Sequence, residues 1–77
     1  MKILTVYLRT LDDVWEFIEH MNEIEGETTL FCGRYSVNAK SVVGVLSLNL
    51  REPVKLEIKN WKEEYRSLLE KYLIERR

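Results

Sequence analysis

The sequence has 77 residues, of which 45% are hydrophobic and 32% are charged, and its formal net charge is −1. This length suits one domain covering residues 1–77, and the mixed charge gives no general reason to bind nucleic acid or an anionic membrane. No apolar stretch approaches the ~20 residues that a membrane span requires. Residues 1–10 lack signal-peptide features and the single cysteine cannot form an internal disulfide, so we expect a cytoplasmic protein.

A strand and a helix are predicted first along the chain. Residues 2–8 (KILTVYL) are rich in β-branched and aromatic side chains, which favour a strand. Thr10 followed three residues later by Asp13 resembles a capping box, and Asp12 adds a negative charge that suits a helix N-terminus. Gly26 is expected to lie just past the helix end. The residues at helical spacing that predict one buried face are Leu11, Val14, Trp15, Ile18 and Met21.

The middle of the chain predicts three more strands and one segment of ambiguous type. Residues 27–32 and 35–39 suit a hairpin around Gly33, and residues 53–59 (PVKLEIK) alternate between apolar and charged side chains. Residues 40–48 (KSVVGVLSL) fit either a buried strand or a short helix, because periodicity alone does not separate the two. In a helix, Gly44 costs about 1 kcal/mol relative to alanine, which predicts that it permits close packing.

The last predicted element is a helix opened by Asn60 with Glu63 and reaching towards Arg76 and Arg77. Its apolar face is formed by Trp61, Tyr65, Leu68, Leu69 and Tyr72. The whole order predicts an α+β fold in which helices cover one face of an antiparallel sheet. The core residues that we predict are Leu11, Val14, Ile18, Leu56, Ile58, Trp61, Tyr65 and Leu68.

Residues 36–50 (SVNAKSVVGVLSLNL) resemble the regulatory-serine segment of HPr, the histidine-containing phosphocarrier of the bacterial sugar phosphotransferase system. That family typically shows Lys-Ser-Ile-Met-Gly-Val, another apolar residue, Ser and Leu, and the order of elements matches over nearly the whole chain. The resemblance implies that the ambiguous segment is a short helix. It also implies an open-faced β-sandwich with a four-stranded antiparallel sheet in the order 1-4-2-3 and three helices on one face.

In the HPr family the serine that matches Ser41 is phosphorylated by a dedicated kinase, and the neighbouring apolar residues contact partner proteins. The resemblance therefore implies a regulatory role for Ser41 and partner contacts through Val42, Val43 and Leu46. It implies protein partners, such as phosphotransferase-system enzymes, an HPr kinase or a transcriptional regulator, and no cofactor. Independently, Ser41 is a good N-cap, and a short helix needs fewer apolar residues than surround it here, so some should be exposed.

One departure from the family bears on phosphotransfer. HPr carries its phosphoryl group on a histidine within Gly-x-His-x-Arg-Pro at the start of the first helix. The matching stretch here is LRTLDDV, so the position of the missing histidine falls on Thr10 or Leu11. Asp12 and Asp13 would repel a phosphoryl dianion at this helix end. We therefore expect no phosphotransfer through a histidine at this position.

The remaining reactive residue types give little support for an enzyme. His20 lies about 130° from the centre of the predicted apolar face, between glutamates, and is expected to be a solvated surface side chain. Cys32 is expected to be buried in a strand, and these two residues are too few for a metal site. The aromatic residues Trp15, Trp61, Tyr65 and Tyr72 are expected in the core rather than in a stacking platform for bases.

Three functions stay open at this point. The favoured hypothesis is an HPr-like binding or regulatory module that acts through the Ser41 helix and does not transfer phosphate. A second is a structural or accessory subunit that keeps only the fold. A third is a working phosphocarrier of the sugar phosphotransferase system that uses a shifted residue.

Overall fold

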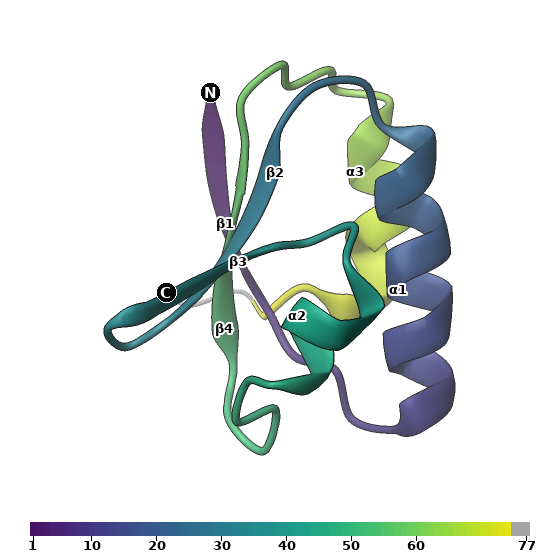
Figure 1. Cartoon of the computed structure of the whole chain (residues 1–77). Coiled ribbons are helices and arrows are strands. Elements are labelled where there is room, and N and C mark those ends of the chain that lie inside the picture. The colour runs from purple at the N-terminus through teal and green to yellow at the C-terminus, as the bar shows by residue number, and fades with distance from the viewer. Residues whose placement is uncertain (75–77) are drawn as a thin grey trace.

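A four-stranded sheet and a layer of helices make up the protein, whose computed structural model describes residues 1–74. Figure 1 shows the sheet edge-on, with all three α-helices on one side of it. The elements in chain order are β1 (Lys2–Val6), α1 (Leu11–Glu23), β2 (Thr28–Cys32), β3 (Tyr35–Asn38), α2 (Val42–Leu46), β4 (Val54–Ile58), α3 (Tyr65–Leu69) and the 3₁₀-helix η1 (Glu70–Tyr72). The α+β class is confirmed.

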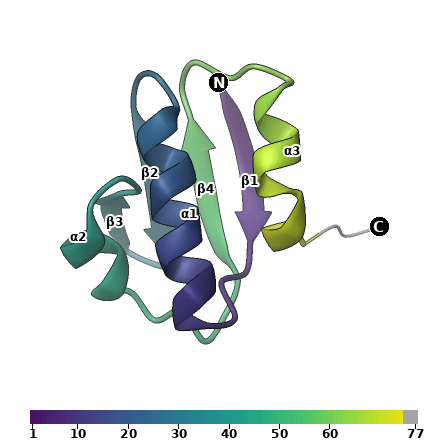
Figure 2. The same ribbon diagram turned by 90° about the vertical axis from the view of Figure 1, so that its right-hand side faces the viewer.

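The sheet has the strand order β1-β4-β2-β3 and all its pairs are antiparallel, as predicted. In Figure 2 the strands follow one another in this order behind α1, with α2 at the β3 side and α3 at the β1 side. Val54, Leu56 and Ile58 of β4 are buried beneath the helices, while Lys55 between them is exposed on the open face. This alternation confirms the prediction that residues 53–59 form a strand with one buried and one exposed face, since a strand presents successive side chains to opposite faces.

The outer edge of β1 is partly covered by the residues that follow η1. The Tyr7 amide donates to the Tyr72 carbonyl at 2.8 Å, and the Ile74 amide donates to the Thr5 carbonyl at 2.9 Å. Val6 and Leu73 form an antiparallel bridge between these bonds. Because an open strand edge is a template for pairing with other chains, this segment protects part of β1 from such pairing.

Helix α1 is rotated relative to the predicted buried face. Val14, Ile18 and Met21 are buried as predicted, but so is Phe17, which packs edge-to-face on Tyr72 at a centroid distance of 5.8 Å. Leu11 and Trp15, in contrast, are 66% and 50% exposed, so their assignment to the core is wrong. The apolar positions of α1 span about 160° of the helix circumference, which is more than the ~100° that one surface helix buries. The edge that contains Phe17 is buried, and the opposite edge, which contains Leu11 and Trp15, is exposed.

The last helix is shorter than predicted and begins later. α3 starts at Tyr65 with Glu64 as its N-cap, so Asn60 lies in a turn and the prediction that it opens the helix is wrong. Glu63 does not complete a capping box, because its carboxylate accepts from the Trp61 indole at 2.5 Å and pairs with Arg66 at 3.4 Å. The predicted helix-end positions of Arg76 and Arg77 lie outside the described residues.

The hydrophobic core lies between the sheet and the helices and contains most of the predicted residues. Val14, Ile18, Leu56, Ile58 and Tyr65 are buried, and Trp61 and Leu68 are partly buried against them. Tyr72 is also buried, as expected of the C-terminal aromatic residues. Within residues 1–74, no helix is long and apolar enough to cross a membrane.

We predict that Leu56→Ala lowers the free energy of unfolding by about 2 to 5 kcal/mol, because the side chain is fully buried at the centre of the sheet. The matched control is Leu11→Ala, the same chemical change at an exposed position, which should cost under about 1 kcal/mol. Urea denaturation measures both. Equal effects of the two changes would contradict the orientation of α1.

Candidate functional site

The first candidate site is the N-terminus of α1, where the capping prediction is confirmed. Thr10 is the N-cap and its Oγ1 accepts a hydrogen bond from the Asp13 amide at 3.0 Å. The Asp13 carboxylate accepts from the amide of Arg9 at 3.1 Å, one residue further back than in a standard capping box. Side chains therefore already satisfy backbone groups at this helix start.

A shallow hollow of about 740 Å³ lies beside this helix start. Its lining comes from Tyr7–Leu11 and Val14 on one side and from Leu48–Arg51, the residues that follow α2, on the other. No histidine or cysteine lines it, and the exposed Asp12 lies in the first turn of α1. A phosphoryl dianion held here would meet the carboxylates of Asp12 and Asp13, and their charge already interacts favourably with the positive helix end.

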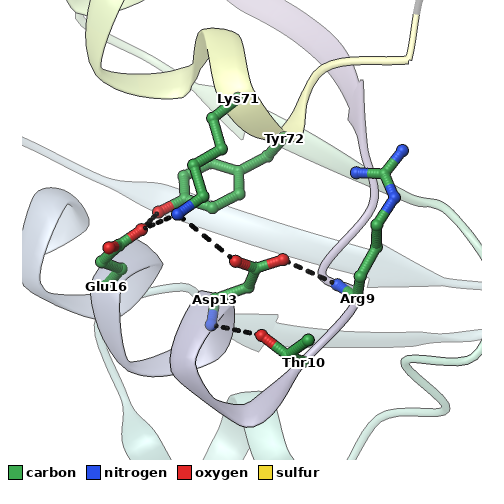
Figure 3. Close-up of polar contacts among 6 residues, drawn as sticks. All are labelled: Arg9, Thr10, Asp13, Glu16, Lys71 and Tyr72. Carbon is green, nitrogen blue, oxygen red and sulfur yellow. Dashed lines mark hydrogen bonds and ion pairs between the residues drawn. The ribbon is translucent and has the colours of Figure 1, made fainter.

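Polar contacts join α1 to the C-terminal helical segment directly behind this site (Figure 3). Lys71 Nζ lies 2.7 Å from Glu16 Oε1 and 3.5 Å from Asp13 Oδ1. The Tyr72 hydroxyl donates to the same Glu16 oxygen at 2.8 Å. The Asp13 carboxylate thus makes two contacts, since it accepts a hydrogen bond from the Arg9 amide and forms an ion pair with Lys71.

These contacts shift three acid–base equilibria. The hydrogen bonds from Lys71 and Tyr72 lower the pKa of the Glu16 carboxyl, and the same carboxylate raises the pKa of Lys71. Burial raises the pKa of the Tyr72 hydroxyl, and its hydrogen bond to Glu16 adds to the effect. Every shift stabilises the protonation states present at neutral pH, as expected of a structural contact rather than a group that exchanges protons during catalysis.

His20 is more enclosed than predicted. Its ring lies 6.4 Å from the Tyr72 ring, and its Nδ1 is buried without a hydrogen-bond partner among residues 1–74. The predicted solvated surface imidazole is therefore half-buried, because the rotation of α1 turns this residue towards the C-terminal helical segment. Within the described residues, no three His, Cys, Asp or Glu side chains are grouped so as to hold a metal ion.

The second candidate site is α2, which the sequence left ambiguous and the structure resolves as a short helix. Ser41 is its N-cap and accepts a hydrogen bond from the Gly44 amide at 3.1 Å. A Cβ on Gly44 would approach Val37 of β3 to 3.2 Å, which is the close packing that the glycine predicted. The sheet-facing side of this helix is therefore defined by Gly44 and the buried Val45.

The exposed side of α2 carries two of the three predicted partner-binding residues. Val43 is 82% exposed and Leu46 is 45% exposed, whereas Val42 is partly buried against the core. The prediction that some apolar residues of this segment face solvent is confirmed for Val43 and Leu46. Val42 contributes to packing and offers less surface to a partner.

Helix α2 runs antiparallel beside α1. The Asn22 side chain near the end of α1 donates to the carbonyl of Lys40, just before α2, at 3.3 Å. Residues 48–51, just after α2, line the hollow at the start of α1. Leu11, Trp15 and Asn22 lie within about 40° of one another around α1. Leu11 and Trp15 thus lie on the flank of α1 that faces α2, and sequence reasoning missed them as surface residues.

The surroundings of Ser41 are more engaged than the sequence indicated. The ammonium group of Lys40 donates to the carbonyl of Ile24, at the C-cap of α1, at 2.6 Å. It therefore does not lie free beside the Ser41 hydroxyl. Cys32 is only partly buried, with its Sγ 3.9 Å from the Asn49 carbonyl oxygen, so it is less enclosed than predicted.

Comparison with known proteins identifies the fold and nothing finer. The structure resembles the crystal structure of HPr-C-His from Thermoanaerobacter tengcongensis with a TM-score of 0.76 and 23% sequence identity. The alignment covers 92% of this chain and 89% of that chain. The chain has an HPr-like fold. No protein-family model and no curated protein sequence matches it.

We predict that Glu16→Gln destabilises the protein more at neutral pH than at acidic pH. The folded state lowers the pKa of Glu16, so the stabilisation by its charge is present above the ordinary value of 4.5 and is lost as pH falls through the folded-state value. Glutamine keeps an acceptor for Tyr72 and removes only the charge. Unfolding curves of both proteins at pH 7 and pH 3 should differ at pH 7 and converge at pH 3; a gap independent of pH would contradict the charge-based account.

Proposed function

We propose that this protein is a non-phosphotransferring binding module with an HPr-like fold. It acts through an apolar surface made by Val43 and Leu46 of α2 together with Leu11 and Trp15 of α1, and we refer to these four side chains as the docking patch. The single observation that carries the proposal is that these side chains are between 45% and 82% exposed on two adjacent helices. Clustered exposed apolar side chains commonly mark contact surfaces for proteins.

The chemistry of the α1 start supports a function without phosphotransfer. Thr10 and Leu11 stand where the family resemblance places the phosphorylated histidine, and neither offers a nitrogen nucleophile. Asp13 is fixed by the Arg9 amide and by Lys71, so its carboxylate does not move aside easily for an incoming anion. Phosphorylation of Ser41 stays a prediction from the resemblance. The ammonium group of Lys40 donates to the Ile24 carbonyl, so it would have to leave that bond to pair with a phosphate on Ser41.

The alternative of a working phosphocarrier is tested by incubating the protein with phosphoenolpyruvate and the general phosphotransferase enzyme. We expect no gain of phosphate by intact mass, while authentic HPr in the same tube gains one. Thr10→His alone should also stay unmodified, because Asp12 and Asp13 remain at the helix end. Full-rate phosphorylation of that variant, or an acid-labile phosphate on His20 of the wild type, would contradict the proposal.

The docking patch is tested by capturing partners from cells with the wild type, Val43→Asp and Ser36→Asp. Val43→Asp places a charge on the most exposed member of the patch, so the fold should persist while partners are lost. Ser36→Asp adds the same charge on an exposed strand position away from the patch and should retain every partner. Thermal melting checks that all three are folded. If Val43→Asp retains every protein captured by the wild type, the structural or accessory alternative is favoured instead.

A further inference from the structure

A row of carboxylates runs along α1 beside the docking patch. Asp12, Glu19 and Glu23 are exposed and lie within about 40° of one another around the helix, at roughly 100° per residue. Trp15 and Leu11 occupy the next strip of the same helix, between this row and α2. We name Asp12, Glu19 and Glu23 the acidic row. One edge of the docking patch is therefore negatively charged along the length of α1.

The acidic row has no ion-pair partner among residues 1–74, unlike the carboxylates that face the C-terminal helical segment. Lys71 neutralises Glu16 and Asp13, whereas none of the salt bridges within this part of the chain includes Asp12, Glu19 or Glu23. Three basic residues lie near the patch, and one of them, Arg51, lines the hollow at the start of α1 together with Leu11. Lys40 donates to the Ile24 carbonyl, and Arg9 stacks on the Tyr7 ring at 4.8 Å.

Two members of the row are placed where they do not stabilise the helix. Glu19 and Glu23 are four residues apart, and like charges at this spacing destabilise a helix by a few tenths of a kcal/mol. Glu23 is the last residue of α1, where the negative end of the helix disfavours a carboxylate. Lysine at either position would suit the isolated helix better. Asp12 suits the start of α1, but Glu19 and Glu23 are not explained by the stability of this helix.

We propose that the docking patch takes a basic amphipathic protein segment, and this inference rests on the function proposed above. An apolar side of the segment covers Trp15, Val43 and Leu46, and its lysine or arginine side chains pair with the acidic row. Charge complementarity of this kind favours partners of one sign and excludes those of the other. The partner class is thus set by α1, while the apolar contact is shared between α1 and α2.

The test uses two synthetic amphipathic helical peptides of equal length with the same leucine and tryptophan face. One carries lysine and the other glutamate on the flanking positions. Titrated against the isotope-labelled protein and followed by NMR, the lysine peptide should bind about tenfold or more tightly at low salt and shift the resonances of Trp15 and Val43. Its advantage should shrink as salt rises from about 0.05 to 0.3 M, because screening weakens exposed ion pairs.

Variants of the protein assign the preference to the acidic row. Glu19→Lys combined with Glu23→Lys should remove the preference for the lysine peptide. Glu57→Lys combined with Glu64→Lys changes the net charge equally, in β4 and at the N-cap of α3 on the β1 side of the sheet, and should keep the preference. Equal binding of the two peptides, binding of neither, or loss of the preference in the control pair would overturn the inference.

The neutral variant Val43→Ser separates this inference from the proposed function. If both peptides bind the wild type equally and both are weakened by Val43→Ser, the docking patch is supported and the basic partner class is refuted. If Val43→Ser leaves binding of the lysine peptide unchanged, the peptide binds elsewhere, and this result overturns the partner inference and counts against the patch itself. If Val43→Ser weakens binding of the lysine peptide and the wild type prefers that peptide, both the docking patch and the basic partner class are supported.

Discussion

The contact between Phe17 and Tyr72 fixes the rotation of α1, and most features of the candidate surface depend on that rotation. The two rings pack edge-to-face, with an interplanar angle of 85°, and both side chains are buried. Such aromatic pairs contribute beyond their buried area. With Phe17 held inward, Glu16 and Asp13 turn towards Lys71 and Tyr72, while Leu11 and Trp15 turn out beside α2. The rotation therefore divides α1 into a polar flank facing the C-terminal helical segment and an apolar flank facing α2.

Local patterns predicted the elements well where one signal dominated. The alternation in residues 53–59 gave the buried side of β4, and the Thr10–Asp13 spacing gave the start of α1. The resemblance in residues 36–50 resolved the α2 segment, which periodicity left ambiguous. Each of these signals acts within a few residues, and tertiary packing did not oppose any of them.

The surface was harder to predict, because it depends on a choice between competing side chains. Helix α1 has more apolar residues than it can bury. Phe17 is buried and Leu11 is exposed because Phe17 packs on Tyr72, which lies far along the chain. Asn60 is a good capping residue by type, yet Glu63 bonds to Trp61 and Arg66 and the helix starts later. In both cases the outcome depends on contacts that a local pattern does not encode.

Strand β1 has its partners at the far end of the sequence, and this has a consequence for synthesis on the ribosome. Its inner edge pairs with β4, and its outer edge meets residues 72–74, so neither partner exists when β1 emerges. The β2–β3 hairpin, in contrast, is complete soon after it is made. Because distant pairings form late and slowly, β1 must wait unpaired until β4 and residues 72–74 have left the tunnel. Until then its apolar side chains and unpaired backbone are open to wrong partners, and a chaperone that covers β1 would prevent such pairing.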